Sequence, residues 1–493
     1  MSLLLQSPVL AVIIPLLFFV VIYMVERRSW RLRNALAVLA PLASFVFLAS
    51  NYSRVLAGER VLIEFPAILP PLGMSFSVDY LSLLVGLVVS GVWFLVAVYS
   101  TEYMVKEHAK NRYYPFSTLT LAGTMGVVLS GDLFTLFLFF ELMSLSAYVL
   151  VVHEETAEAM RAGYKYLVLT IIGGLALFFA IIAVFEIAGT VSFASGGFIA
   201  EASGLAVLAF YGFLIGFGIK AGIVPLHVWL PEAHPVAPSP ASALLSGIML
   251  KTGVYGLIRV VFNVFGHEVV RAGGLDTVLL GLAAVTIFLG SAVAIAQDDI
   301  KRRLAYSSVG QMGYILLGIG LLQERALIGA IFHIFAHAIM KATLFLSAGA
   351  IIYKTGKRRV SEWRGLGREM TVTMVSFTVA ALSMIGIPPL VGFVSKWELA
   401  LGSLDAGSWG FVILLLLSSL MNFIYYFPVI QNTLFGEQHA AKEVSPKTRE
   451  LPLAMLAPIV FMALVIVFVD LFPQSGVLDL AKRAAQALFL VVK

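Results

Sequence analysis

Five ionisable residues lie far from the ends of long apolar stretches in this sequence. They are Glu141, Lys220, Lys251, Lys341 and Lys396. A charge at the centre of a bilayer costs roughly 2.5 to 3.5 kcal/mol on insertion scales, so such residues usually face protein or water and have partners. Carboxylates and amines in that setting can bind and release protons, which is chemistry suited to ion transfer.

Glu141 lies nine residues after Asp132, in the segment LFTLFLFFELMSLSAYVL. At 1.5 Å per residue that is about 13 Å along a helix, which places the carboxylate near mid-membrane. No other ionisable residue occurs in the segment. We expect a role in ion transfer, and the alternative is a protonated or paired carboxylate that only holds helices together.

Lys220 lies in the glycine-rich stretch GFGIKAGIVP, five residues before Pro225. Glycine and proline interrupt helices, which frees backbone carbonyls and lets water enter. A lysine there can be desolvated or held charged by a carboxylate, and switching between these states transfers a proton. Snorkelling to the interface is the alternative, but Lys220 is too far from either end of its stretch.

Lys251 and Lys396 are two further candidates in apolar surroundings. Lys251 falls about twelve residues into its stretch, and Lys396 follows the Pro388–Pro389 pair. Both could instead serve only packing or the interface. Glu398 is either the partner of Lys396 or an interfacial charge.

His333, His337 and Lys341 follow one another at steps of four, so all three project from one face of a helix. A row of titratable groups can relay protons, because neutral imidazole accepts at one nitrogen and donates at the other. Packed polar residues are one alternative. A metal site is another, which two histidines without an acidic ligand on the same helix support poorly.

The segment VPLHVWLPEAHPVAPSP is rich in proline, so we expect no regular helix in it but a rigid loop at the cytoplasmic mouth. Its prolines are Pro225, Pro231, Pro235, Pro238 and Pro240. His227 is a candidate member of the pathway. Glu232 and His234 are expected to fix the loop.

The elements that must position these residues are membrane helices. The chain of 493 residues is 60% hydrophobic and 12% charged, against roughly 25% charged in an average soluble domain. We expect an all-α polytopic membrane protein with about fourteen transmembrane helices. The predicted spans are 4–24, 31–50, 79–100, 113–130, 132–152, 163–188, 204–230, 239–262, 276–296, 303–322, 326–353, 373–402, 406–433 and 451–472.

Basic residues indicate how these spans are oriented. About 21 lysines and arginines lie in one set of alternate loops and about 7 in the other, which predicts that the first set is cytoplasmic and both termini are outside. The net charge of +5 is spread over short loops, so it does not indicate a nucleic-acid partner. We expect the tail from about 475 to 493 to form an amphipathic interfacial helix.

The seventh and twelfth spans share an unusual composition. Each combines glycine and proline with one lysine, in GFGIKAGIVPLHVWLP and GIPPLVGFVSKWELAL, and they lie five spans apart. Paired interrupted spans are typical of inverted-repeat transporters at their ion sites. The chain contains no cysteine and no glycine-rich phosphate loop, and we expect no catalytic residue, cofactor or metal site in it.

Four segments resemble the antiporter-like subunits shared by respiratory complex I, Mrp sodium/proton antiporters and membrane-bound hydrogenases. They are FFELMSLSAYVLV, GIKAGIVPLHVWLPEAHPVAPSPASALLSGIMLKTGVYGLIR, DDIKRRLAYSSVGQMGY and HIFAHAIMKATLFLSAGAI. The resemblance covers at least residues 115–400 and is strongest to the D-type subunit of Mrp antiporters or its counterparts in hydrogenase-type and sulfur-reductase complexes.

The resemblance implies two inverted five-helix repeats, at 113–262 and 263–433, preceded by helices 1–3 (1–112) and followed by helix 14 and the tail (434–493). It assigns the membrane glutamate to Glu141, the broken-helix lysine to Lys220, the connecting lysine to Lys251 and the second-repeat lysine to Lys396. Glu141 and Lys220 would pair and separate as an ion passes.

The expected function is proton or sodium translocation within a multisubunit complex of a prokaryotic plasma membrane. Other membrane subunits and the transported ions are the expected partners. The host complex could be an antiporter or an ion-translocating oxidoreductase. A free-standing carrier of an organic solute and a purely structural subunit are the competing functions. The first would need a roomy central site with ligand-specific groups, and the second would need charges that only fix helix register.

Overall fold

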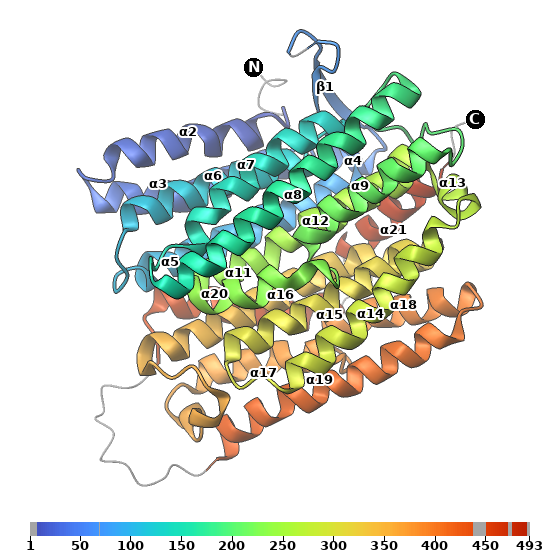
Figure 1. Cartoon of the computed structure of the whole chain (residues 1–493). Helices are drawn as coiled ribbons and strands as arrows, with labels where there is room; N and C mark the ends of the chain where they lie inside the picture. The colour runs from blue at the N-terminus through green and yellow to red at the C-terminus, as the bar shows by residue number, and fades with distance from the viewer. Residues whose placement is uncertain (1–6, 69, 437–449, 472–475, 491–493) are drawn as a thin grey trace.

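The computed structural model describes residues 7–68, 70–436, 450–471 and 476–490. Residues 4–6 of the predicted first span, the end of the last span, and both ends of the predicted tail lie outside the described residues. The described chain is a bundle of long helices that lie side by side (Figure 1).

The first part of the bundle contains six long helices joined by short turns. They are α2 (Leu10–Val25), α3 (Trp30–Ala49), α5 (Tyr80–Tyr103), α6 (Lys110–Val128), α7 (Leu133–Val151) and α8 (Ala157–Ala188). A short helix α4 (Tyr52–Leu56) and an antiparallel hairpin, β1 (Val61–Phe65) and β2 (Met74–Val78), separate α3 from α5. The hairpin projects from one end of the bundle (Figure 1).

The second part contains the remaining long helices. They are α9 (Gly204–Ala221), α12 (Leu250–Arg259), α14 (Leu275–Ile295), α15 (Ile300–Gly320), α16 (Glu324–Thr355), α17 (Thr371–Ile385), α18 (Val391–Asp405), α19 (Trp409–Phe435) and α20 (Leu453–Leu471). A short α13 (His267–Ala272) precedes α14.

Among the described residues, nine helical segments are long and apolar enough to cross a membrane. The expected number of about fourteen is therefore not confirmed. Three apolar helices are shorter, at Leu10–Val25, Thr371–Ile385 and Leu453–Val469. Others, such as α6 and α15, begin with polar or basic residues that lower their mean hydropathy.

The first interrupted span breaks at Gly222, which ends α9 with φ of 71°. A positive φ strains any residue with a Cβ, so glycine is the residue suited to this turn. A 3₁₀ turn (Leu226–Trp229), α10 (Leu230–Val236) and α11 (Ser239–Leu244) follow. The expectation of no regular helix here was wrong. Pro231 and Pro240 stand in the first turns of α10 and α11, where their missing N–H groups have no helical partner, and Pro235 lies inside α10 near its end.

The proline-rich segment is also more deeply buried than a loop at a mouth would be, since nearly every residue from 229 to 244 is buried. The chain then continues through a π-helical turn (Leu245–Met249), α12 and a second π-helical turn (Val260–Phe265). Such π-turns interrupt the regular bonding of a helix and often occur at functional sites.

The second interrupted span, predicted at 373–402, is two half-helices. The first, α17, ends before Gly386, which has φ of 96°, and α18 begins at Val391. Both interrupted spans thus break at a left-handed glycine followed by proline.

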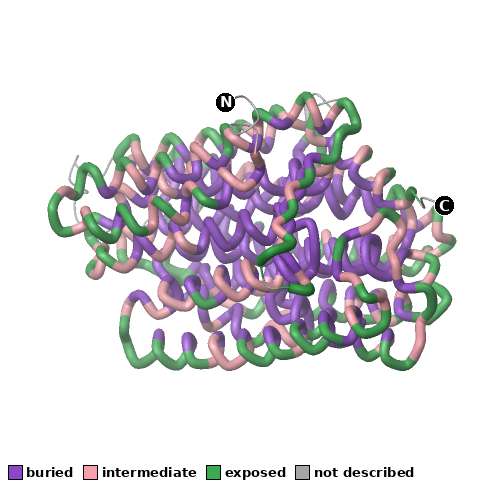
Figure 2. The backbone as a smooth tube through the Cα atoms, turned by 90° about the horizontal axis from the view of Figure 1, so that it is seen from above, coloured by how far each residue is buried: buried purple, intermediate pink, exposed green. Residues whose placement is uncertain are grey.

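Helix α16 lies at the centre of the bundle. Its most apolar stretch of 18 residues is completely buried, whereas less than half of the corresponding stretch is buried in peripheral helices such as α8 and α14. Figure 2 shows buried positions concentrated in the interior and exposed ones along the rim. The row of titratable residues predicted on this helix is therefore internal.

The predicted tail forms a helix, α21 (Gly476–Phe489). Its apolar residues are buried against α5 and α16, so the apolar face covers protein rather than standing free. Arg483 pairs with Asp479 on the other face, 2.8 Å apart. The helix begins beside Tyr52 and ends with Phe489 against His267.

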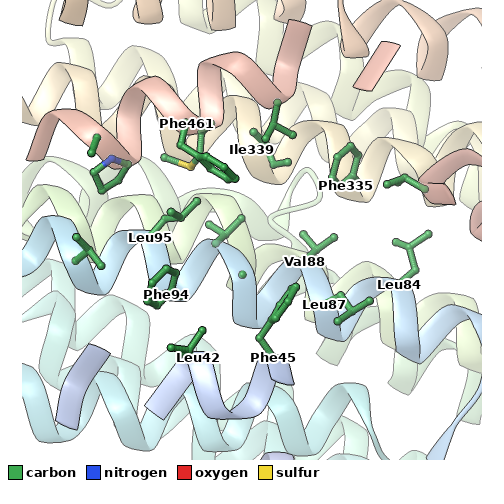
Figure 3. A pocket seen from close by; sticks show the side chains of 18 of the residues that line it. Leu42, Phe45, Leu84, Leu87, Val88, Phe94, Leu95, Phe335, Ile339 and Phe461 are labelled. Atoms are coloured by element: carbon green, nitrogen blue, oxygen red, sulfur yellow. The ribbon is translucent and has the colours of Figure 1, made fainter. Parts of the chain in front are cut away.

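A cavity of about 650 Å³ opens between α3, α5, α16 and α20 (Figure 3). Its lining is apolar, with Phe45, Leu87, Phe335 and Phe461 among the side chains. It contains no charged residue, so it offers no ligand to an ion.

Candidate functional site

Glu141 lies on the middle turns of α7, facing α8. Its Oε1 atom is buried and has no hydrogen-bond partner among the described residues. The carboxylate lies against Gly174, where an added Cβ would stand 2.6 Å from Oε1. Glycine at this position of α8 therefore makes the space that the carboxylate occupies.

Lys220 is on the last turn of α9, just before the break, and is 3% exposed. Its Nζ donates a hydrogen bond to the hydroxyl of Tyr166 on α8, 2.9 Å away. That hydroxyl in turn donates to the carbonyl oxygen of Ser144 at 2.8 Å. Ser144 is one helical turn from Glu141, so the three groups link α7, α8 and α9.

Among the ion pairs of the described residues, none joins Glu141 to Lys220. The two charges interact electrostatically but are not in contact. The expected ion pair is therefore not seen in the described residues, and Tyr166 binds the lysine instead. A cavity of about 10 Å³ adjoins Lys220 and Tyr166, which is roughly the room that one water needs.

Aromatic rings enclose the ammonium group of Lys220. Its Nζ lies 5.0 Å from the ring centre of Tyr166 and 5.7 Å from that of Phe140. Trp229 completes the enclosure and donates from Nε1 to the carbonyl oxygen of Ile219 at 2.7 Å. The carbonyl oxygen of Ile219, beside the break, therefore has a hydrogen-bond partner. Lys220 lies next to a space lined by aromatic rings.

Lys251 lies at the start of α12, next to the first π-turn, and is 2% exposed. Its Nζ donates to the carbonyl oxygen of Ser246 at 2.6 Å. The hydroxyl of Ser246 lies 2.6 Å from that of Ser308 on α15. The lysine thus lies where α12 and the turn before it pack against α15.

The row on α16 is fully buried. The rings of His333 and His337 stack with centres 5.7 Å apart. Lys341 donates to the carbonyl oxygen of Leu304 at 2.9 Å and to the hydroxyl of Ser307 at 2.8 Å. His337 has no hydrogen-bond partner on either ring nitrogen among the described residues.

Lys396 lies on α18, after the second break, and binds the end of α17. Its Nζ donates to the carbonyl oxygens of Met384 and Ile385, each at 2.9 Å. These carbonyls end a half-helix, where a positive charge is favoured. An added Cβ on Gly386 would stand 2.9 Å from the Cδ of Lys396, so glycine also admits the side chain.

Two residues near Lys396 in the sequence, Ser395 and Glu398, bind other side chains. Ser395 bonds Nδ1 of His333 at 2.8 Å. Glu398 pairs with Arg325 at 2.9 Å and is therefore not the partner of Lys396. The lysine is compensated by carbonyl oxygens instead of a carboxylate.

The residues of the proline-rich segment lie beside this row. His227 is partly exposed, with its ring 6.2 Å from that of Tyr306. His234 is buried and stacks on Phe345 with ring centres 4.7 Å apart. Glu232 pairs with Lys165 and ties α10 to α8.

The interior contains many polar atoms without a protein partner. They include atoms of Glu141, Ser144, His234, Gln311, His333, His337 and Ser347. Buried polar groups in folded proteins are satisfied by protein or by ordered water. The described part of the chain can therefore hold water along this row of side chains.

Sequence reasoning missed several groups that contact these residues. Tyr166 and Ser395 are uncharged, and nothing in their spacing marks them. It also missed the pair of Arg259 and Asp79, joined by two hydrogen bonds of 2.7 and 2.8 Å. The signal in the sequence was an arginine inside the predicted span 239–262, which needs a carboxylate. Arg259 is 2% exposed in the structure.

Two family models match the chain. One, described as NADH:quinone oxidoreductase/Mrp antiporter, TM, matches residues 130–422. The other, described as NADH-Ubiquinone oxidoreductase (complex I), chain 5 N-terminus, matches residues 71–114. The first match contains all of the site residues named above from α7 to α18.

Curated relatives are similar over nearly the whole chain. NADH-quinone oxidoreductase subunit N of Desulforudis audaxviator is 36% identical, over 97% of this chain and 98% of its own length. The D subunit of the Na(+)/H(+) antiporter of Alkalihalophilus pseudofirmus is 30% identical, over 93% of each chain.

Solved structures have the same fold. A chain of the Mrp complex from Dietzia sp. DQ12-45-1b is similar with a TM-score of 0.88 and 26% identity, over 99% of this chain and 98% of that one. A chain of the membrane-bound sulfane sulfur reductase, an archaeal respiratory membrane complex, gives a TM-score of 0.89 at 25% identity, over 98% of each chain.

Proposed function

The chain belongs to the NADH:quinone oxidoreductase/Mrp antiporter family of membrane subunits, and from this premise we propose that it carries protons or sodium ions through its interior as part of a multisubunit complex. The observation that carries the proposal is the buried row of titratable side chains linking α7 to α18. Its relatives include sodium/proton antiporter and quinone oxidoreductase subunits.

Contacts between neighbouring helices support the continuity of this row. At Gly253, an added Cβ would lie 2.6 Å from the backbone nitrogen of Ala221, so α12 packs closely beside the residue that follows Lys220. His337 is within electrostatic range of Lys251 and Lys341. His333 is within range of Lys251 and Lys396.

In the proposed mechanism, Glu141 accepts the ion at one end of the row. Lys220 moves between the Tyr166 hydroxyl and the Glu141 carboxylate. Its positive charge opposes binding of a proton or sodium ion to the carboxylate when it is close, and permits binding when it is on Tyr166. Water beside the unpartnered imidazoles bridges Lys251, the histidines and Lys396. Lys341 sets the local potential from its fixed position on Ser307. His227 contributes at the proline-rich segment.

We further infer the finer architecture predicted from the sequence: fourteen crossings, with inverted repeats at 113–262 and 263–433, flanking helices at 1–112 and 434–493, and both termini outside. The matching breaks at Gly222 and Gly386 support the repeats. The ends of the described chain lie at the same end of the bundle as the hairpin (Figure 1), which is compatible with both termini on one side.

Two competing functions are less well supported. A carrier of an organic solute needs a site of roughly 300 Å³ or more with ligand-specific polar groups. The cavity beside Lys220 has about 10 Å³, and the cavity of about 650 Å³ between α3, α5, α16 and α20 is lined by apolar side chains. A purely structural role would pair the buried charges with one another, but Glu141 has an unpartnered oxygen. The host complex is proposed to be of the Mrp antiporter, hydrogenase, sulfur reductase or complex I kind.

The proposal is tested by ion flux into vesicles that contain the complex isolated with this chain. Glu141→Gln should abolish flux of protons and sodium while the amount of assembled complex is unchanged, since volume is kept and the charge removed. Glu141→Asp should retain partial flux. Glu186→Gln, at an exposed position of α8, is the matched control and should transport normally. Near-normal flux in Glu141→Gln would reject the proposal.

A further inference from the structure

Two turns at one end of the bundle bring together groups that transport does not use. Glu107 and His108 lie in the turn between α5 and α6, and His153 and Glu154 lie in the turn between α7 and α8. One ligand atom from each of Glu107, His108 and His153 lies within 4.8 Å of the others. We expected no metal site from the sequence, in which Glu107–His108 and His153–Glu154 are two separate pairs.

His153 is the unusual member of this cluster. It is 1% exposed, and neither ring nitrogen has a hydrogen-bond partner among the described residues. Its ring centre lies 5.1 Å from that of His108 and 5.8 Å from that of Tyr113. A ring nitrogen of His153 is therefore available to bind an ion.

Two carboxylates, Glu107 and Glu154, lie beside it, and the positive charges of Lys110 and Lys301 act on Glu107 from outside the cluster. The Oε2 of Glu154 lies 3.9 Å from Nδ1 of His108, too far for a hydrogen bond. Imidazoles and carboxylates gathered this closely form a set of ligands that a divalent cation would stabilise.

We propose that Glu107, His108 and His153 bind a divalent transition-metal ion of the zinc type, with Glu154 as a fourth ligand. Two imidazoles with carboxylates suit Zn²⁺ better than Mg²⁺ or Ca²⁺, which prefer oxygen ligands alone. Ligands about 2.0–2.2 Å from a tetrahedral zinc lie roughly 3.4 Å apart. The present separations need a small contraction, which the exposed His108 side chain can supply.

The two turns are already held together. Arg112 pairs with Glu155 across them. Ala109 follows Glu107 and His108 and has φ of 46°. Glu155 follows His153 and Glu154 and has φ of 52°. A bound ion would therefore join two fixed turns and cross-link the α5–α6 and α7–α8 hairpins.

The test uses the purified full-length chain, washed with chelator and titrated with Zn²⁺ alone. Bound metal is counted by mass spectrometry after dialysis, and Co²⁺ in place of Zn²⁺ reports the coordination geometry through its visible absorption. We expect one ion per chain, and affinity at least tenfold weaker in His108→Gln and in His153→Gln. His267→Gln, a histidine of α13 remote from the cluster, is the matched control and should bind as wild type does.

His108 is exposed, so its substitution should leave the fold intact, which a thermal transition without metal would check. Zn²⁺ should raise the transition temperature of wild type and of His267→Gln but not of His108→Gln. Unchanged affinity in both cluster variants, or equal loss in His267→Gln, would overturn the proposal. Because binding is measured without flux, its failure is independent of the proposed transport function.

Discussion

The Nζ of Lys220 lies 2.9 Å from the hydroxyl of Tyr166, so a tyrosine holds the lysine at the break of α9. The carboxylate of Glu141 lies against Gly174, eight residues further along the same helix, α8. A lysine held by a neutral group can be released to a carboxylate more readily than one already in a buried ion pair.

The first prediction concerns Tyr166→Phe, which removes the hydroxyl and keeps the ring. The buried Lys220 loses its protein hydrogen bond, a loss of about 1–3 kcal/mol for a buried polar group. Transport in vesicles should fall by roughly 5- to 100-fold at unchanged assembly. Tyr211→Phe, at an exposed position of α9, should transport normally. Equal flux in the two variants would show that Tyr166 does not position the lysine.

The second prediction concerns Gly174→Ala. The new Cβ would meet Oε1 of Glu141 at 2.6 Å, so the carboxylate must move. Since a displacement of about 1 Å can reduce a reaction of positioned groups by about 100-fold, flux should fall at least tenfold. Gly281→Ala is the control, because nothing lies within 4 Å of its added Cβ. Normal flux in Gly174→Ala would mean that the position of the carboxylate is not critical.

The third prediction concerns the stacked rings of His333 and His337, 5.7 Å apart. If they act as one relay, water or the remaining imidazole can bridge a single missing step. His333→Ala and His337→Ala together should then reduce flux by more than the product of their separate effects. A double-mutant cycle on initial flux measures the coupling. Strictly multiplicative losses would indicate two unrelated packing roles.

The fourth prediction concerns Asp79, the N-cap of α5, which also binds Arg259. Although burial alone would raise it, Arg259 holds the pKa of Asp79 well below its usual range. The lowered pKa means that this stabilisation is present above about pH 4 and is lost as pH falls through the folded-state value.

Asp79→Asn should therefore destabilise the chain by about 3 kcal/mol at pH 7, since it leaves a buried arginine unpaired. The difference from wild type should shrink in strongly acidic buffer. Thermal unfolding in detergent as a function of pH measures this. Asp405→Asn, at an exposed position, should unfold as wild type does at every pH. A loss that does not depend on pH would contradict the ionic account.

The sequence alone determined the class of protein and the residues that carry unusual chemistry. Charges such as Glu141 and Lys251 stand out in apolar stretches because burying them is unfavourable without a function or a partner. The spacing of His333, His337 and Lys341 predicted one helical face, and the structure shows the histidine rings stacked. Local periodicity decides these features, so a single sequence contains them.

Only the tertiary structure decided the partners of these residues. Lys396 binds carbonyl oxygens of α17 in place of Glu398, and Lys220 binds Tyr166. Tyrosine and backbone oxygens occur throughout the chain, so their roles depend on which helices pack together. The cluster that includes Glu107 and His153 likewise arises where two turns meet. Contacts between distant segments are set by packing, which no local pattern encodes.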